Sequence, residues 1–158
     1  MVLGARDGPA PGPEGWQHVQ WYEGEDRPSP EPDGQVAELA AFLRGSAARS
    51  APALLWSEQE PAPDGSAGAL AAALERELAR PVRPVPERPA GPWRHGRSAV
   101  LLVQRHAAAE IHLSPPPGSA ARRSTLRLRA SQCLLVPAGW SYRLDPRSPT
   151  QPLALALP

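Results

Sequence analysis

The residues best suited to bind a metal ion lie within one stretch of the chain, at His95, His106, Glu110 and His112. Imidazole and carboxylate groups together are a common ligand set for transition metals. Glu110 and His112 are two positions apart, so on a β-strand both side chains point to the same face. We therefore treat these four residues as candidate metal ligands. The alternative is that they are partly exposed strand and turn residues on an arginine-rich surface.

Four arginines form a second group of charged side chains, at Arg122, Arg123, Arg127 and Arg129. Arg127 and Arg129 share one strand face, so their guanidinium groups can converge on a phosphate or on an acidic peptide. No aromatic residue is interleaved with these arginines in the sequence, which argues against nucleic acid as the partner. The alternative is a solvated outer surface of a sheet.

Nucleophilic chemistry has weaker support from the sequence. Cys133 lies in an apolar run, where burial raises the pKa of a thiol and makes it a poor nucleophile. Ser141 lacks the G-x-S-x-G setting of a catalytic serine. Because Cys133 is the single cysteine, we expect a reducing compartment. The first 15 residues contain no apolar signal core, so a cytoplasmic protein is expected. No apolar stretch reaches the length of a membrane span, so no membrane partner is expected.

Charge is unevenly distributed along the 158 residues. Residues 1–79 contain 13 Asp and Glu against 5 Arg, a net charge of −8, whereas residues 80–158 contain 3 against 12, a net charge of +9. This asymmetry favours contact between an acidic segment and a basic domain, within one chain or between chains. A coincidental distribution of solvated charge is the alternative. A protein or peptide, acidic in character, is accordingly the expected kind of partner.

The elements that must position these residues follow an N-terminal arm. Residues 1–34 are acidic and rich in Pro and Gly, which predicts a flexible arm, although Trp16, Trp21 and Tyr22 interrupt this composition. The remaining residues, 35–158, are predicted to form one domain.

Two helices are predicted at the start of this domain. Apolar residues at helical spacing predict a helix over 35–44, with Asp33 as its N-cap and Gly45 as its stop. A second helix is predicted over 66–80, because Ser66 can cap it and Pro81 ends it.

Short apolar or alternating segments predict an antiparallel sheet. Strands are expected over 51–56, 99–104, 109–113, 125–130, 133–136, 141–144 and 153–157, and within the Pro-interrupted connection 82–93. Strands spaced this closely leave no room for crossover helices. The predicted fold class is therefore α+β and mainly β. Two N-terminal helices would pack on a small jelly-roll barrel, complete or incomplete, whose strands span about 82–158.

The stretch from Ser131 to Tyr142, SQCLLVPAGWSY, combines a buried strand, a turn at Pro137 and Gly139, and a second strand. It resembles the motif G-D-x-L-Y-x-P-x-G-W-x-H of JmjC-type cupin oxygenases, in their ribosomal-oxygenase-like branch. The Pro, Gly and Trp positions match. The resemblance implies a cupin-like barrel and iron- and 2-oxoglutarate-dependent hydroxylation of a protein side chain. Tyr142 stands where the resemblance places an iron-binding histidine.

A second segment, residues 94–104, is similar to the family pattern H-x-D-x-x-x-V-F-x-L-Q. The resemblance places the other two iron ligands at Arg94 and Gly96, with His95 between them and on the opposite strand face. The lysine that would bind 2-oxoglutarate falls near Ala109. All four functional positions thus depart from the family pattern. The two matching segments lie in the second half of the chain.

These departures predict a catalytically degenerate domain that acts as a binding or accessory module and holds no cofactor. Its barrel mouth is expected to be an aromatic and cationic pocket, where Arg94 or Arg97 meets Tyr142 and binds a small carboxylate. Ala109 and Trp140 are expected to line the same pocket. One alternative is a protein hydroxylase that binds Fe(II) and 2-oxoglutarate through substitute metal ligands. Another is a gene remnant, which would not unfold cooperatively.

Overall fold

Two helices and nine strands make up the part of the chain that the computed structural model describes, residues 34–59 and 65–158. The arm predicted over 1–34 lies outside these residues, with the exception of Gly34. The three aromatic residues of the arm and the predicted N-cap Asp33 lie outside them as well. Neither described helix is long and apolar enough to cross a bilayer.

Both predicted helices are present, with shifted ends. Helix α1 spans Gly34–Ser46 and continues through Gly45, so the predicted stop at Gly45 is wrong. Burial of Leu43 and Ser46 against the core explains why the last turn persists. Helix α2 spans Ala67–Leu78. The predicted N-cap is confirmed, because the Ser66 hydroxyl accepts a hydrogen bond from the Ala69 N–H at 3.1 Å.

The nine strands form two antiparallel sheets, which confirms a mainly β, α+β fold. The five-stranded sheet contains, in spatial order, β1 (Ala53–Trp56), β7 (Gln132–Val136), β4 (Ala99–Val103), β9 (Leu153–Leu157) and β2 (Arg83–Pro84). The four-stranded sheet contains β3 (Arg94–His95), β8 (Ser141–Leu144), β5 (Ala108–Ser114) and β6 (Ser124–Arg129).

The strand pairings are nested about the β5–β6 hairpin. Outward from this hairpin, β4 pairs with β7, β3 with β8 and β2 with β9. Two further pairings, β4 with β9 and β5 with β8, complete the two sheets. The predicted turn between β7 and β8 is confirmed and carries the chain from one sheet to the other. Gly139 in this turn has φ +87°, a conformation that favours glycine.

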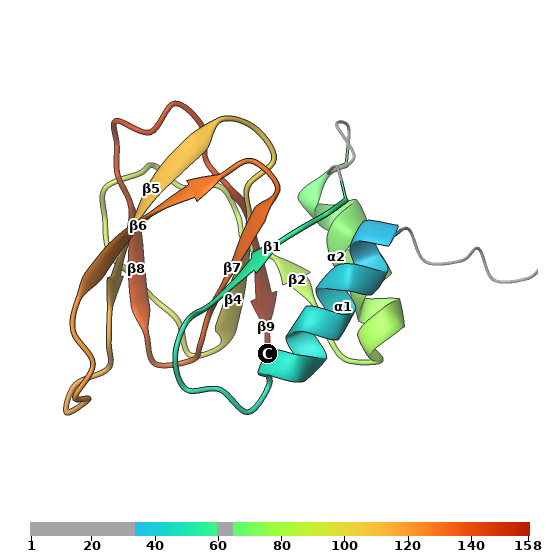
Figure 1. Ribbon diagram of the computed structural model, residues 1–158, viewed down its shortest axis with the longest axis horizontal. Coiled ribbons are helices and arrows are strands. Elements are labelled where there is room, and N and C mark those ends of the chain that lie inside the picture. The colour runs from blue at the N-terminus through green and yellow to red at the C-terminus, as the bar shows by residue number, and fades with distance from the viewer. Residues whose placement is uncertain (1–33, 60–64) are drawn as a thin grey trace, which may run out of the picture. The chain divides into compact units, whose positions relative to one another are not determined.

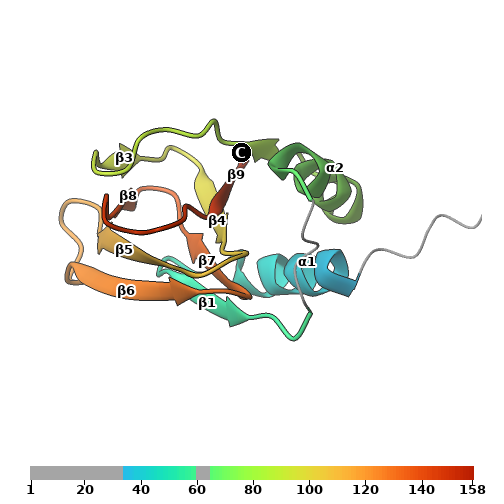
Figure 2. The same cartoon turned by 90° about the horizontal axis from the view of Figure 1, so that it is seen from above.

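The five-stranded sheet is the middle of three layers (Figures 1 and 2). Alternate side chains of its strands, such as Leu101 and Leu135, pack against α1 and α2. The intervening side chains, such as Leu102 and Leu134, pack against residues of β5, β6 and β8. We call this second cluster the inter-sheet core. The predicted packing of the helices on the strands is therefore confirmed.

Strand β1 is less buried than the sequence predicts. Ala53 and Leu55 face the helices, but the side chains of Leu54 and Trp56 are 51% and 66% exposed. Because β1 is the edge strand beyond β7, its second face is not covered by the four-stranded sheet. The apolar sequence of residues 51–56 predicts a short buried strand, and that prediction is wrong for one of its two faces for this reason.

Candidate functional site

The four-stranded sheet has one buried face and one polar face. On β5, Ile111 and Leu113 point into the inter-sheet core, whereas Glu110 and His112 point away from it. Strands β6 and β8 alternate in the same way, with Arg127 and Arg143 on the polar side. We call this polar side the outer face. Ionisable side chains from several strands lie on this face.

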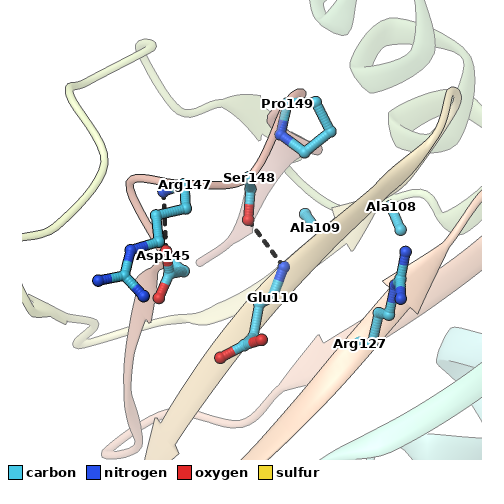
Figure 3. Close-up of a pocket in the computed structure, with 8 residues that line it drawn as sticks. All are labelled: Ala108, Ala109, Glu110, Arg127, Asp145, Arg147, Ser148 and Pro149. Atoms are coloured by element: carbon cyan, nitrogen blue, oxygen red, sulfur yellow. Dashed lines mark hydrogen bonds between the residues drawn. The ribbon is translucent and has the colours of Figure 1, made fainter.

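Three side chains on the outer face form a compact cluster, Glu110, His112 and Asp145. The Asp145 N–H donates to the Glu110 carbonyl at 3.0 Å, so the residue after β8 lies beside β5. His112 Nε2 is 3.5 Å from Glu110 Oε1 and 3.5 Å from Asp145 Oδ2. The three ligand atoms all lie within 4.8 Å of one another. Glu110 and Asp145 also line a shallow pocket of about 230 Å³ (Figure 3).

The structure keeps Glu110 and His112 together but separates them from the other two candidate ligands. His95 is on β3, where its Nδ1 lies 2.5 Å from Ser141 Oγ. His106 is exposed in the loop before β5. Asp145 takes the third place in the cluster. Sequence alternation over Ser141, Arg143 and Asp145 would put Asp145 on the outer face, but only the register of β5 with β8 puts it beside Glu110.

Local hydrogen bonds hold Asp145 in its ionised form. The Arg147 N–H donates to Asp145 Oδ1 at 2.7 Å (Figure 3). This backbone bond, and to a lesser extent His112 and the charge of Arg147, lower the pKa of Asp145. Asp145 therefore stays a carboxylate at neutral pH and below.

A second part of the outer face is cationic. The Arg143 and Arg123 guanidinium carbons lie 5.1 and 5.9 Å from the centre of the Trp93 ring, within cation–π range. These residues and His112 line a shallow pocket of about 270 Å³. Arg143 Nε is buried and has no hydrogen-bond partner within residues 34–59 and 65–158. Trp93 was not predicted from the sequence as part of this group. It is distant from Arg123 and Arg143 in the sequence, and only the folding of the chain brings them together.

Two of the three positions that the resemblance assigns to iron ligands lie on paired strands, and the third, Gly96, directly follows β3. Arg94 on β3 is the cross-strand partner of Tyr142 on β8. The Tyr142 ring is buried in the inter-sheet core, with the Arg94 guanidinium carbon 5.7 Å from its centre. At Gly96, an added Cβ would lie only 2.8 Å from the Ser98 carbonyl oxygen. The position of the family's aspartate therefore has no room for a side chain unless the backbone shifts.

The other residues expected around this pocket are dispersed. Ala109 is buried under the outer face and Arg97 is exposed in the loop between β3 and β4. Trp140 is buried, as expected, and its indole N–H donates to the Ser50 carbonyl at 2.9 Å. It lines a different cavity, together with residues such as Leu43 and Pro137. The structure thus does not bring Arg97, Ala109 and Trp140 into one pocket.

The predicted burial of Cys133 is confirmed. Desolvation, with a smaller contribution from the charge of Glu38, raises its pKa to about 12. Its side chain packs in the cluster between the five-stranded sheet and the helices, away from the outer face. Comparison with known proteins found no matching family model and no matching curated sequence.

Proposed function

We propose that this domain is a catalytically inactive, cupin-like jelly roll that binds an acidic protein segment on the outer face of its four-stranded sheet. The nested pairing of β2 to β9 supports the jelly roll. Such pairing describes one long antiparallel hairpin that is wrapped into two four-stranded sheets, with β1 added at one edge.

The pairing of Arg94 with Tyr142 supports the alignment with the JmjC-type oxygenases. Ligands of one metal ion must lie close together, and the residues at two of the aligned ligand positions are cross-strand neighbours. The same pair of residues also supports the proposal that the domain is catalytically inactive. A permanently charged guanidinium group stacks on a buried phenol at the place where the family would bind Fe(II).

The aligned residues do not fit iron or 2-oxoglutarate. Arg94 would repel a cation, Gly96 supplies no carboxylate, and the space beside Gly96 is closed by the Ser98 carbonyl. Ala109 is buried and uncharged, so it cannot pair with the carboxylate of 2-oxoglutarate. A binding function must therefore use the surface of the domain.

The cationic part of the outer face favours an acidic partner. Arg123, Arg127 and Arg129 are exposed, and among the described residues no Asp or Glu forms a salt bridge with any of them or with Arg143. Arg127 and Arg129 lie on one side of β6 and can each bind a carboxylate in bidentate fashion. This uncompensated charge lies within the half of the sequence that carries +9.

Binding of a fluorescently labelled Glu-rich peptide, measured by anisotropy at low and high salt, tests the proposed partner. We expect saturable, salt-sensitive binding that is lost in the double variant R127E/R129E. The double variant R76E/R83E is the matched control, because it makes the same charge change at exposed positions on α2 and β2, outside the four-stranded sheet. Equal loss in both variants would show a general charge effect and contradict a site on the outer face.

Incubation of the purified protein with ferrous iron, 2-oxoglutarate and a protein extract tests the proposed inactivity. We expect no succinate above that formed by the same mixture without the domain. Succinate formation that depends on the domain would favour the alternative of a hydroxylase with substitute ligands.

A further inference from the structure

We propose that Glu110, His112 and Asp145 form a binding site for a zinc ion on the outer face. The site lies on the opposite side of the sheet from Tyr142, and it is distinct from the iron position implied by the resemblance. Its ligands come from β5 and from the residue that follows β8. Two hydrogen-bonded strands therefore fix the positions of all three backbones.

The distances within the cluster match a shared metal better than direct hydrogen bonds. A charge-assisted hydrogen bond from imidazole to carboxylate spans about 2.7–2.9 Å, whereas both His112 distances are 3.5 Å. Ligand atoms that lie 2.0–2.1 Å from a tetrahedral zinc ion are separated by roughly 3.3–3.4 Å. His112 Nε2 and the two carboxylate oxygens already approach this spacing. Because the Glu110 side chain is half exposed, it can rotate to close the remaining gap to Asp145.

Two of the three side chains are held in place by groups outside the cluster. His112 Nδ1 lies 2.9 Å from Thr125 Oγ1. In the tautomer with Nδ1 protonated, this bond leaves the Nε2 lone pair directed at the carboxylates, as in many histidine ligands of zinc. Asp145 is held by the Arg147 N–H, which donates to its Oδ1 at 2.7 Å. Two of the three ligands are thus oriented before any ion binds.

The local charge is compatible with a divalent cation. Two carboxylates offset the charge of Zn²⁺, and His112 adds a neutral nitrogen. Arg127, Arg143 and Arg147 lie nearby, but among the described residues none of their guanidinium nitrogens lies within 4.0 Å of either carboxylate. The carboxylates are directed at His112 instead. A ligand set that includes imidazole favours Zn²⁺ over Mg²⁺ or Ca²⁺, which prefer oxygen ligands alone.

Competition with a chromophoric zinc indicator, after removal of bound metals with a chelator, tests this site. We expect one zinc ion per chain and no competition by Mg²⁺. Variants H112A and D145N should each weaken binding by about 100-fold or more, and T125V by about 10–100-fold through loss of the His112 partner. Zinc should also raise the melting temperature of the wild-type protein, and it should not do so for H112A.

Matched controls decide whether the bound zinc occupies this cluster. Variants H106A and H95A remove exposed histidines that lie outside it, and both should retain wild-type zinc affinity. S124A, next to Thr125 on β6, should also retain it. Wild-type protein that does not bind zinc, or affinity that falls equally in H106A and H112A, would overturn the proposal. These measurements use zinc alone, so their outcome is independent of the peptide binding proposed above.

Discussion

The two sheets of this domain differ in how their strand faces are buried. The three central strands of the five-stranded sheet, β7, β4 and β9, are covered on both faces and have almost entirely apolar sequences, QCLLV, AVLLV and LALAL. The four-stranded sheet is covered on one face only, and its strands alternate, as in AAEIHLS and SYRL. The first pattern builds the core, whereas the second leaves a row of side chains free for binding.

This difference separates stability from function within one fold. Substitutions in the five-stranded sheet or the inter-sheet core remove buried contacts and should act on the free energy of unfolding. Substitutions on the outer face should change ligand affinity and leave stability almost unchanged. Four variants test this separation.

The largest effect is expected for Trp140→Ala. Trp140 is only 6% exposed, packs in the inter-sheet core and donates a hydrogen bond to the Ser50 carbonyl. Its loss should lower the free energy of unfolding by about 3–5 kcal/mol, measured by urea denaturation. The control is Trp56→Ala, because Trp56 is 66% exposed and its loss should change stability by about 0.5 kcal/mol or less. An unchanged midpoint for Trp140→Ala would contradict the burial of the Trp140 side chain.

A pair of neighbouring residues on β6 compares the two faces of one strand. Leu128 is fully buried in the inter-sheet core, and Leu128→Ala should cost about 2–5 kcal/mol. Arg127 is exposed on the outer face, and Arg127→Ala should change the free energy of unfolding by about 0.5 kcal/mol or less. Peptide affinity should show the reverse order. Similar stability losses in both variants would mean that the outer face is structurally required.

These pairs also show what the sequence could predict. The alternation of Leu126 to Arg129 places each side chain on a face without knowledge of the partner strand, so the buried and polar sides of β6 were predictable. The cap at Ser66 is a local signal of the same kind. Local spacing determines both features.

Features that depend on strand register were not predictable. Asp145 joins Glu110 and His112 only because β8 pairs with β5, and Trp93 meets Arg123 and Arg143 only through the packing of distant segments. The exposure of Leu54 and Trp56 depends on β1 being an edge strand, which its apolar sequence does not reveal. The exact composition of a site thus requires tertiary pairing.

The buried thiol of Cys133 in the five-stranded sheet predicts that the stability of the domain falls at alkaline pH. Folding raises the pKa of its thiol from 9.0 to about 12, so the folded protein retains a proton that the unfolded chain loses. This contribution to stability is fully present below pH 9 and is lost as the pH rises toward 12. Urea denaturation at several pH values should therefore show a decline in this window that is smaller in Cys133→Ala. Native Cys133 should also react slowly with iodoacetamide at pH 8, and rapid alkylation of the folded protein would contradict its burial.

The smallest effect on stability is expected for the loss of the Ser66 side chain at the N-cap of α2. The Ser66 hydroxyl accepts the Ala69 N–H, one of the four donors that the first turn of α2 leaves without an intrahelical partner. Ser66→Ala should lower the free energy of unfolding by about 1 kcal/mol, and Ser66→Asp should restore it, because a carboxylate accepts the same hydrogen bond at the positive end of the helix. Ser50→Ala should have no such effect, because Ser50 is exposed and it is its backbone carbonyl that accepts the Trp140 indole N–H. A loss in Ser66→Ala that Ser66→Asp does not recover would show that the serine does not stabilise the helix as a cap.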